Sequence, residues 1–82
     1  MDKELERYFE TYFDLFATPG WKQFIKDTEG NINLVSDLMA VKDANDLYYR
    51  KGQLETLHRI VNFKELIERS YKEQTDEDSE RF

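Results

Sequence analysis

The fold is decided by a change of helical register within residues 38–54, LMAVKDANDLYYRKGQL. Upstream of this stretch, apolar side chains recur at steps of three and four, which is the pattern of one buried helical stripe. Continuing that stripe would place Lys42 and Asp46 in the core, and the next apolar stripe, which begins at Leu47, has a different phase. The sequence therefore predicts that one helix ends and another begins across a turn at 41–46.

The helix before the turn is predicted to cover 19–40. Thr18 is a good N-cap, and Pro19 suits the first helical position because its missing N–H costs nothing there. The apolar stripe of this helix consists of Trp21, Ile25, Thr28, Ile32, Val35 and Met39. Gly30 weakens the middle of the helix, so the sequence leaves open whether the helix is kinked there.

The helix after the turn is predicted to cover 44–61, with Asp43 as its N-cap. A short fourth helix is expected at 63–72, where apolar residues again recur with helical spacing. The expected fold is all-α, with 19–40 and 44–61 forming a long antiparallel hairpin and shorter helices at its ends.

The N-terminal segment is predicted to be a helix over 2–16 with an aromatic stripe. The stripe consists of Leu5, Tyr8, Phe9, Tyr12, Phe13 and Phe16. On one interpretation these side chains complete the core of a small domain. A core this small hardly covers them all together with Trp21, so some of the surplus is expected to contact another chain. The candidate interaction residues are therefore the aromatic ones: Tyr8, Phe9, Tyr12, Phe13, Phe16 and Trp21.

The chain has 82 residues, which predicts a single domain over 1–72. It has no cysteine and a formal charge of −6, and five of its acidic residues lie in 73–82, which is expected to be a disordered acidic tail. The rest of the chain is roughly balanced in charge, which argues against a general binder of phosphate backbones. No apolar run reaches the length of a membrane span, and the first residues do not read as a signal peptide.

Catalytic and metal-binding patterns are missing from the sequence. The one histidine, His58, lies beside an apolar stripe and has no spaced cluster of carboxylates around it. The three glycines are far apart, so they form no phosphate-binding loop. The sequence predicts a protein that is not an enzyme, with no cofactor and no metal site.

Gly52 lies inside a predicted helix, where glycine costs about 1 kcal/mol relative to alanine. It is on the side of Tyr48, Glu55 and Arg59 rather than on the apolar stripe. One explanation is a second contact face, against the N-terminal helix or another subunit, so Gly52 is a further candidate interaction residue.

The C-terminal sequence EDSERF is acidic and ends in an aromatic residue, Phe82. It resembles in outline the C-terminal docking tails of single-stranded DNA-binding proteins. That resemblance implies that the terminal phenylalanine enters a pocket on a partner. Arg81 interrupts the acids here, and nothing upstream reads as the β-barrel of those proteins. A solubilising tail is the other interpretation.

Three pieces of the sequence carry a second resemblance: the helix start at Pro19 and Trp21, the run Gly52-Gln53-Leu54 with Leu57, and the segment 63–67. Over about 19–70 the chain resembles small helical proteins encoded by tailed bacteriophages. That resemblance implies a non-catalytic protein found in the bacterial host cytoplasm or in the virion, associated with virion genes.

Two functions are expected from these patterns. The first is a small helical interaction protein of a phage, which docks apolar helix faces to itself as an oligomer or to a virion structural protein. The alternative is an acidic inhibitor of a host enzyme or defence protein, although the acids concentrated at the C-terminus count against a rigid mimic of DNA.

Overall fold

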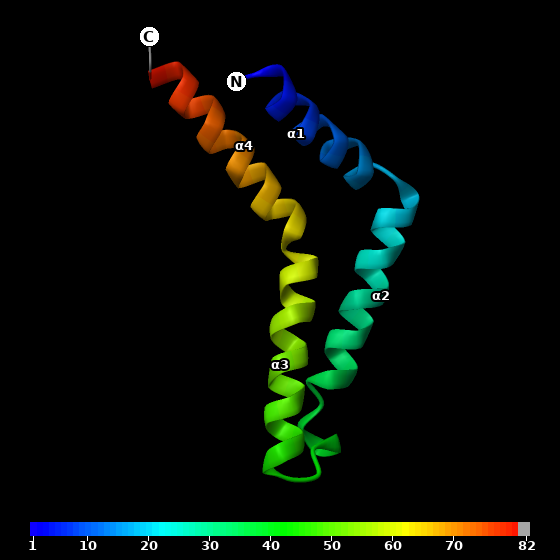
Figure 1. Ribbon diagram of the computed structural model, residues 1–82. Helices are drawn as coiled ribbons and strands as arrows, with labels where there is room; N and C mark the ends of the chain where they lie inside the picture. Colours follow the sequence, from blue (N-terminus) through cyan, green and yellow to red (C-terminus); the bar gives the residue numbers. More distant parts are fainter. Residues whose placement is uncertain (81–82) are drawn as a thin grey trace. The chain divides into compact units, whose positions relative to one another are not determined.

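The computed structural model describes the backbone of residues 1–80 and the side chains through Asp76. Its helices are α1 (Lys3–Phe16), α2 (Pro19–Val35), α3 (Ala44–Val61) and α4 (Phe63–Glu80), with a 3-10 turn, η1 (Leu38–Ala40), between α2 and α3 (Figure 1). No strand occurs in residues 1–80. The prediction of an all-α protein is therefore confirmed.

The chain divides into two compact units. Unit 1 contains Met1–Lys22 together with α4, and unit 2 is Gln23–Asn62. The prediction of one domain over 1–72 stays a prediction.

The helices begin at the residues that the sequence indicates. The Asp2 carboxylate accepts a hydrogen bond from the Leu5 amide at 2.7 Å, and the Asp43 carboxylate accepts one from the Asp46 amide at 2.8 Å. The Thr18 hydroxyl accepts a hydrogen bond from the Trp21 amide at 3.1 Å. Each of these bonds satisfies a backbone donor that the first helical turn leaves without a partner, so local chemistry fixes three of the helix starts.

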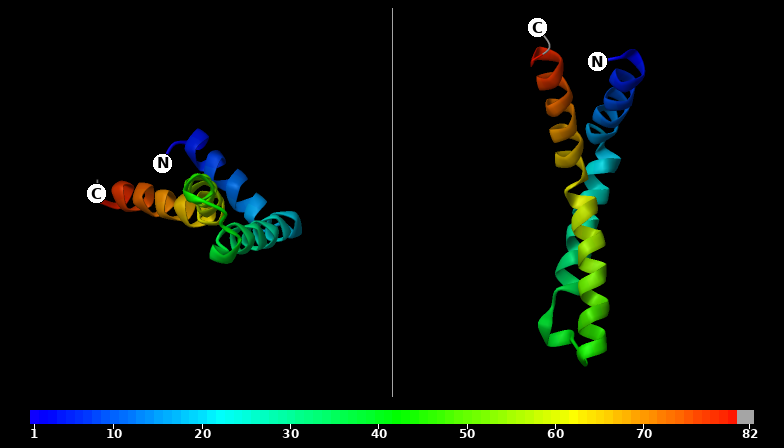
Figure 2. Two further views of the ribbon diagram at one scale, coloured as in Figure 1. Left: turned by 90° about the horizontal axis from the view of Figure 1, so that it is seen from below. Right: turned by 60° about the vertical axis from the view of Figure 1, so that its left-hand side comes forward.

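Unit 1 has an aromatic core between α1 and α4. Its buried residues are Phe9, Phe16 and Ile67, and the partly buried residues packed against them are Met1, Leu5, Tyr12, Phe13, Trp21 and Phe63. The rings meet mainly edge to face, as for Phe9 and Phe13 of α1 against Tyr71 of α4, each with ring centroids 5.3 Å apart. Aromatic rings favour this geometry because the positive edge of one meets the negative face of the other. These contacts hold α1 beside α4 (Figure 2).

The helix predicted over 19–40 ends earlier, at Val35. In a continuous helix, the carbonyls of Leu34 and Val35 would accept hydrogen bonds from the amides four residues on. Here the Arg50 guanidinium donates to both carbonyls, at 3.4 and 3.1 Å. The Met39 amide donates instead to the Asp37 carboxylate at 3.0 Å, which starts η1. The helix itself runs without interruption through Gly30.

The fourth helix is longer than the sequence predicts. It continues past Lys72 to Glu80, and the Thr75 hydroxyl donates to the Tyr71 carbonyl at 2.8 Å within it. The residues from 73 to 80 include three glutamates and one glutamine, which have high helix propensity, and no glycine or proline. The expected disordered acidic tail is therefore not confirmed, and Arg81 and Phe82 lie outside the described residues.

Candidate protein-interaction surface

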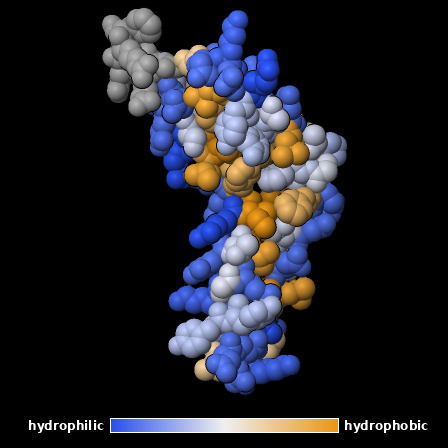
Figure 3. Space-filling view, viewed as in Figure 1, coloured by the Kyte–Doolittle hydropathy of each residue, from blue (hydrophilic) through white to orange (hydrophobic). Residues whose placement is uncertain are grey.

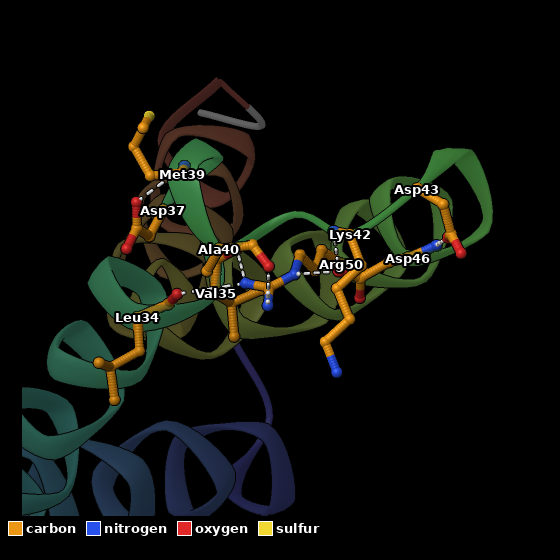
Figure 4. Close-up of polar contacts among 9 residues, drawn as sticks. All are labelled: Leu34, Val35, Asp37, Met39, Ala40, Lys42, Asp43, Asp46 and Arg50. Carbon is orange, nitrogen blue, oxygen red and sulfur yellow. Dashed lines mark hydrogen bonds and ion pairs between the residues drawn. The ribbon is translucent and has the colours of Figure 1, made fainter.

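Arg50 fixes the connection between α2 and α3. Its guanidinium donates to the Val35 and Ala40 carbonyls, at 3.1 and 3.4 Å, while its Nε forms a 3.2 Å ion pair with Asp46 one turn earlier in α3 (Figure 4). The side chain is only 20% exposed. A planar guanidinium with several donors suits this task, because one side chain satisfies carbonyls at the end of α2 and in η1 at once.

Asp46 is held in its ionised form by the same network. The Lys42 amide donates to its carboxylate at 3.0 Å, and this backbone hydrogen bond is the largest cause that lowers the pKa of Asp46. Desolvation, the second largest cause, opposes this lowering, and the hydrogen bond and charge of Arg50 then lower the pKa further. The connection is thus ordered by side-chain chemistry, and the apolar residues on it are held in defined positions.

Large apolar side chains are exposed throughout unit 2. The most exposed are Met39 (93%), Leu38 (77%), Leu34 (73%), Tyr48 (71%) and Tyr49 (68%), and Phe24 and Leu47 are about half exposed. Among the described residues of unit 2, Thr28 alone is buried, and its hydroxyl donates to the Phe24 carbonyl at 2.8 Å. Unit 2 therefore buries no apolar side chain fully, whereas unit 1 buries three.

Two shallow hollows share Tyr48 as a common wall. The first has a volume of about 300 Å³ and is lined by Val35, Ser36, Leu38, Val41, Leu47, Tyr48, Arg50, Lys51 and Leu54. The second has a volume of about 540 Å³ and is lined by Tyr48, Tyr49, Gly52, Gln53, Thr56 and Leu57. We call these residues together with Met39 the Tyr48 surface. On the face seen in Figure 3, hydrophobic side chains are interspersed with hydrophilic ones rather than covered by them.

Gly52 is one of the residues that line the second hollow. A Cβ added at this position would meet no side chain and no backbone beyond its own helical turn within 4 Å, so the space beside Gly52 is open. The second contact face expected at Gly52 stays a prediction.

Replacing Gly52 by alanine is expected to raise the free energy of unfolding of the monomer by about 0.5–1 kcal/mol, because alanine loses less backbone entropy in a helix. Gly30 is a matched control, since it is also helical and has equally open space around it. Gly30→Ala should give a similar gain. Urea unfolding at low micromolar protein concentration measures both changes, and a loss of stability in Gly52→Ala alone would contradict the open environment of this site.

The candidate residues of the aromatic stripe lie mostly in the core of unit 1. Phe9 and Phe16 are 3% and 4% exposed, and Tyr12, Phe13 and Trp21 are partly buried against them. Tyr8 is 47% exposed and is the member of the stripe whose side chain is most open to solvent. Completion of the core is therefore the interpretation that this structure favours for most of the stripe. Phe82 lies outside the described residues.

The exposed residues Leu38, Met39 and Tyr49 were not among the candidate residues expected from the sequence. The sequence does contain an indication that Leu38 and Met39 lie outside the preceding helix, because both follow Asp37, a residue type that caps helical turns. This indication was obscured because Met39 also fits the periodicity of the preceding helix. The error about where α2 ends therefore hid the exposed apolar residues.

Two basic side chains form contacts within the chain. Arg50 is used in the connection, and Lys64 forms a 3.9 Å ion pair with Glu68 on α4. His58 is exposed. In the part of the chain that the structure describes, no three histidine or acidic side chains gather as metal ligands, and no helix has the length and apolar character needed to cross a bilayer.

No protein-family model, curated protein or solved structure matches this chain. Its function is therefore inferred from the residues and geometry of the surface itself, because an α-helical fold alone is compatible with many functions.

Proposed function

We propose that this chain is a non-enzymatic interaction protein, encoded by a phage, that docks apolar helix surfaces to itself or to a virion structural protein. The observation that supports this proposal is the state of unit 2, which spans Gln23–Asn62 without one fully buried apolar side chain among its described residues. A segment of about 40 residues has difficulty burying enough surface to be stable alone and usually depends on oligomerisation or another reinforcement.

The Tyr48 surface provides the apolar area for such docking. Exposed apolar residues that stand singly are normal on proteins, whereas a contiguous group usually marks an interaction site. Tyr48 and Tyr49 are favourable anchors, since tyrosine combines a large apolar ring with a polar hydroxyl and is enriched where interfaces gain most of their energy.

The pairing of α2 and α3 as a helical hairpin belongs to the same proposal. It is supported by the hydrogen bonds from Arg50 of α3 to the Leu34 and Val35 carbonyls at the end of α2. This link holds Leu38 and Leu47 around one hollow, so the hairpin end presents them together.

The inhibitor alternative is favoured by one feature, the continuation of α4 to Glu80. Glu73 and Asp76 are exposed on this helix, and a helix presents acids in a more regular array than a disordered tail would. Virion purification separates the two functions: a structural role predicts the protein in washed particles, and an inhibitor predicts early expression without incorporation.

A photo-reactive benzophenone side chain in place of Met39 tests the docking role in the cells where the protein is naturally made. Met39 is 93% exposed, so a bound partner is expected to react with a probe there and give discrete cross-linked species. The control is the same probe at Glu29, an exposed position on α2 in the same unit. The same probe at Tyr49, 68% exposed on α3, covers the second hollow. If neither Met39 nor Tyr49 gives more cross-linked product than Glu29, the proposed function is wrong.

A further inference from the structure

The outward face of α3 has a hollow and two protruding rings side by side. All residues that line the second hollow lie on α3, and Gly52, which has no side chain, is one of them. Tyr48 and Tyr49 rise beside it, 71% and 68% exposed. The same helix therefore carries both a projection and a recess within little more than one turn.

Gly30 shows that a helical glycine alone does not produce this arrangement. It also has open space around it, but the residues at helical spacing from it are Lys26, Asp27, Asn33 and Leu34, with no aromatic ring. A glycine flanked by exposed tyrosines is thus particular to α3.

We propose that this face binds a second copy of the chain, with the two α3 helices antiparallel across a two-fold axis at Gly52. The proposal rests on the proposed function and names its partner. In this arrangement each Tyr48 lies opposite Thr56 of the other copy, and each Asn45 lies opposite Arg59. A two-fold interface requires a surface that is complementary to itself, and a recess beside a projection meets that requirement.

The charges along α3 favour the antiparallel direction. Its start carries the acids Asp43 and Asp46, and its last turn carries His58 and Arg59. Antiparallel packing places the acidic start of one helix near the basic end of the other and also opposes the two helix dipoles. Parallel packing would place like charges together.

Glycine at the crossing point allows the two backbones to approach closely, as small residues do where helices cross. The area available is modest. A whole aromatic side chain buries about 150–250 Å², so four partly exposed tyrosines and their neighbours give an interface at or below the lower end of the standard size, about 1,200 Å² in total. The expected dimer is therefore weak and concentration-dependent.

Sedimentation equilibrium on the purified full chain tests this interface with matched variants. The unmodified protein should pass from monomer to dimer between about 10 μM and 1 mM, where weak interfaces of this size associate. Gly52→Leu fills the recess and should raise the dissociation constant at least about tenfold, as expected for overpacking of a close contact. Gly30→Leu should leave it unchanged, and circular dichroism checks that both variants stay helical.

Isotope-filtered NOE spectra of mixed labelled and unlabelled chains test the orientation. Contacts between the Tyr48 ring of one copy and the Thr56 methyl group of the other are expected. A monomer at all concentrations, equal dissociation constants for the Gly52 and Gly30 variants, or intermolecular contacts on another face would each overturn the inference. Cross-linking at Met39 to a different protein, combined with a monomeric chain, would overturn the dimer and leave the proposed function standing.

Discussion

Replacing Phe16 by alanine is expected to lower the free energy of unfolding by about 3–5 kcal/mol, the range for removing a buried phenylalanine ring. Phe16 is 4% exposed, and its ring centroid lies 5.0 Å from that of Trp21 and 6.0 Å from those of Tyr12 and Phe63. The loss is a large share of the about 5–15 kcal/mol that stabilises a typical native domain. Urea unfolding followed by the fluorescence of Trp21, the one tryptophan, measures it.

Leu15→Ala is the control for this change, because Leu15 is the neighbouring residue on α1 and is 42% exposed. Its truncation should cost less than about 1 kcal/mol, in the range of surface substitutions. The near-ultraviolet circular dichroism of the aromatic rings should be retained in Leu15→Ala and reduced in Phe16→Ala. Equal losses of stability in the two variants would mean that Phe16 is not part of a packed core.

The helix starts and the outline of the helices could be predicted from the sequence because their causes are local. Thr18 before Pro19 and Asp43 before Ala44 satisfy backbone donors only three residues away. The phase change between residues 41 and 46 is also local, since it requires only that apolar stripes face a core. Each of these features depends on a few neighbouring residues.

The end of α2 could not be predicted because its cause is distant in the sequence. Arg50 reaches carbonyls 15 and 16 residues earlier, and periodicity does not reveal such a contact. The extent of α4 differs from the prediction because high charge density does not exclude a helix. Arg69 and Glu65 form a 3.4 Å ion pair on α4, and the glutamates that follow Lys72 have high helix propensity.

The candidate site was predicted only in part. A periodic stripe shows which residues share one face of a helix, but it does not show whether another element covers that face. Phe9 and Phe16 are covered by α4, whereas Tyr48 beside Gly52 is not covered by any described element. Gly52 was recognisable because glycine within a helix has a cost that calls for an explanation. Met39 fitted a buried stripe and could be assigned to the surface only once the end of α2 was known.

Replacing Arg50 by lysine is expected to lower the free energy of unfolding by about 1.5–3 kcal/mol, the value of a hydrogen-bond set to a charged group. Lysine keeps the charge beside Asp46, but its ammonium lacks the planar fork that reaches Asp46 and the Val35 and Ala40 carbonyls together. Hydrogen exchange should locate the loss of stability. Compared with the unmodified protein, exchange in the variant should speed up more for the η1 amides than for the α1 amides.

Arg59→Lys is the matched control, since it makes the same chemical change on the same helix at an exposed position. It should alter the free energy of unfolding by no more than about 0.5 kcal/mol. The pKa of Asp46, followed by NMR in Arg50→Met, should rise but stay below its ordinary value, because the Lys42 amide remains as the largest cause of the lowering. Equal stability of the Arg50 and Arg59 variants would show that the connection is ordered without the guanidinium. The side-chain contacts left to hold η1 and the start of α3 would then be the Asp37 and Asp43 caps and the hydrogen bond from the Lys42 amide to the Asp46 carboxylate.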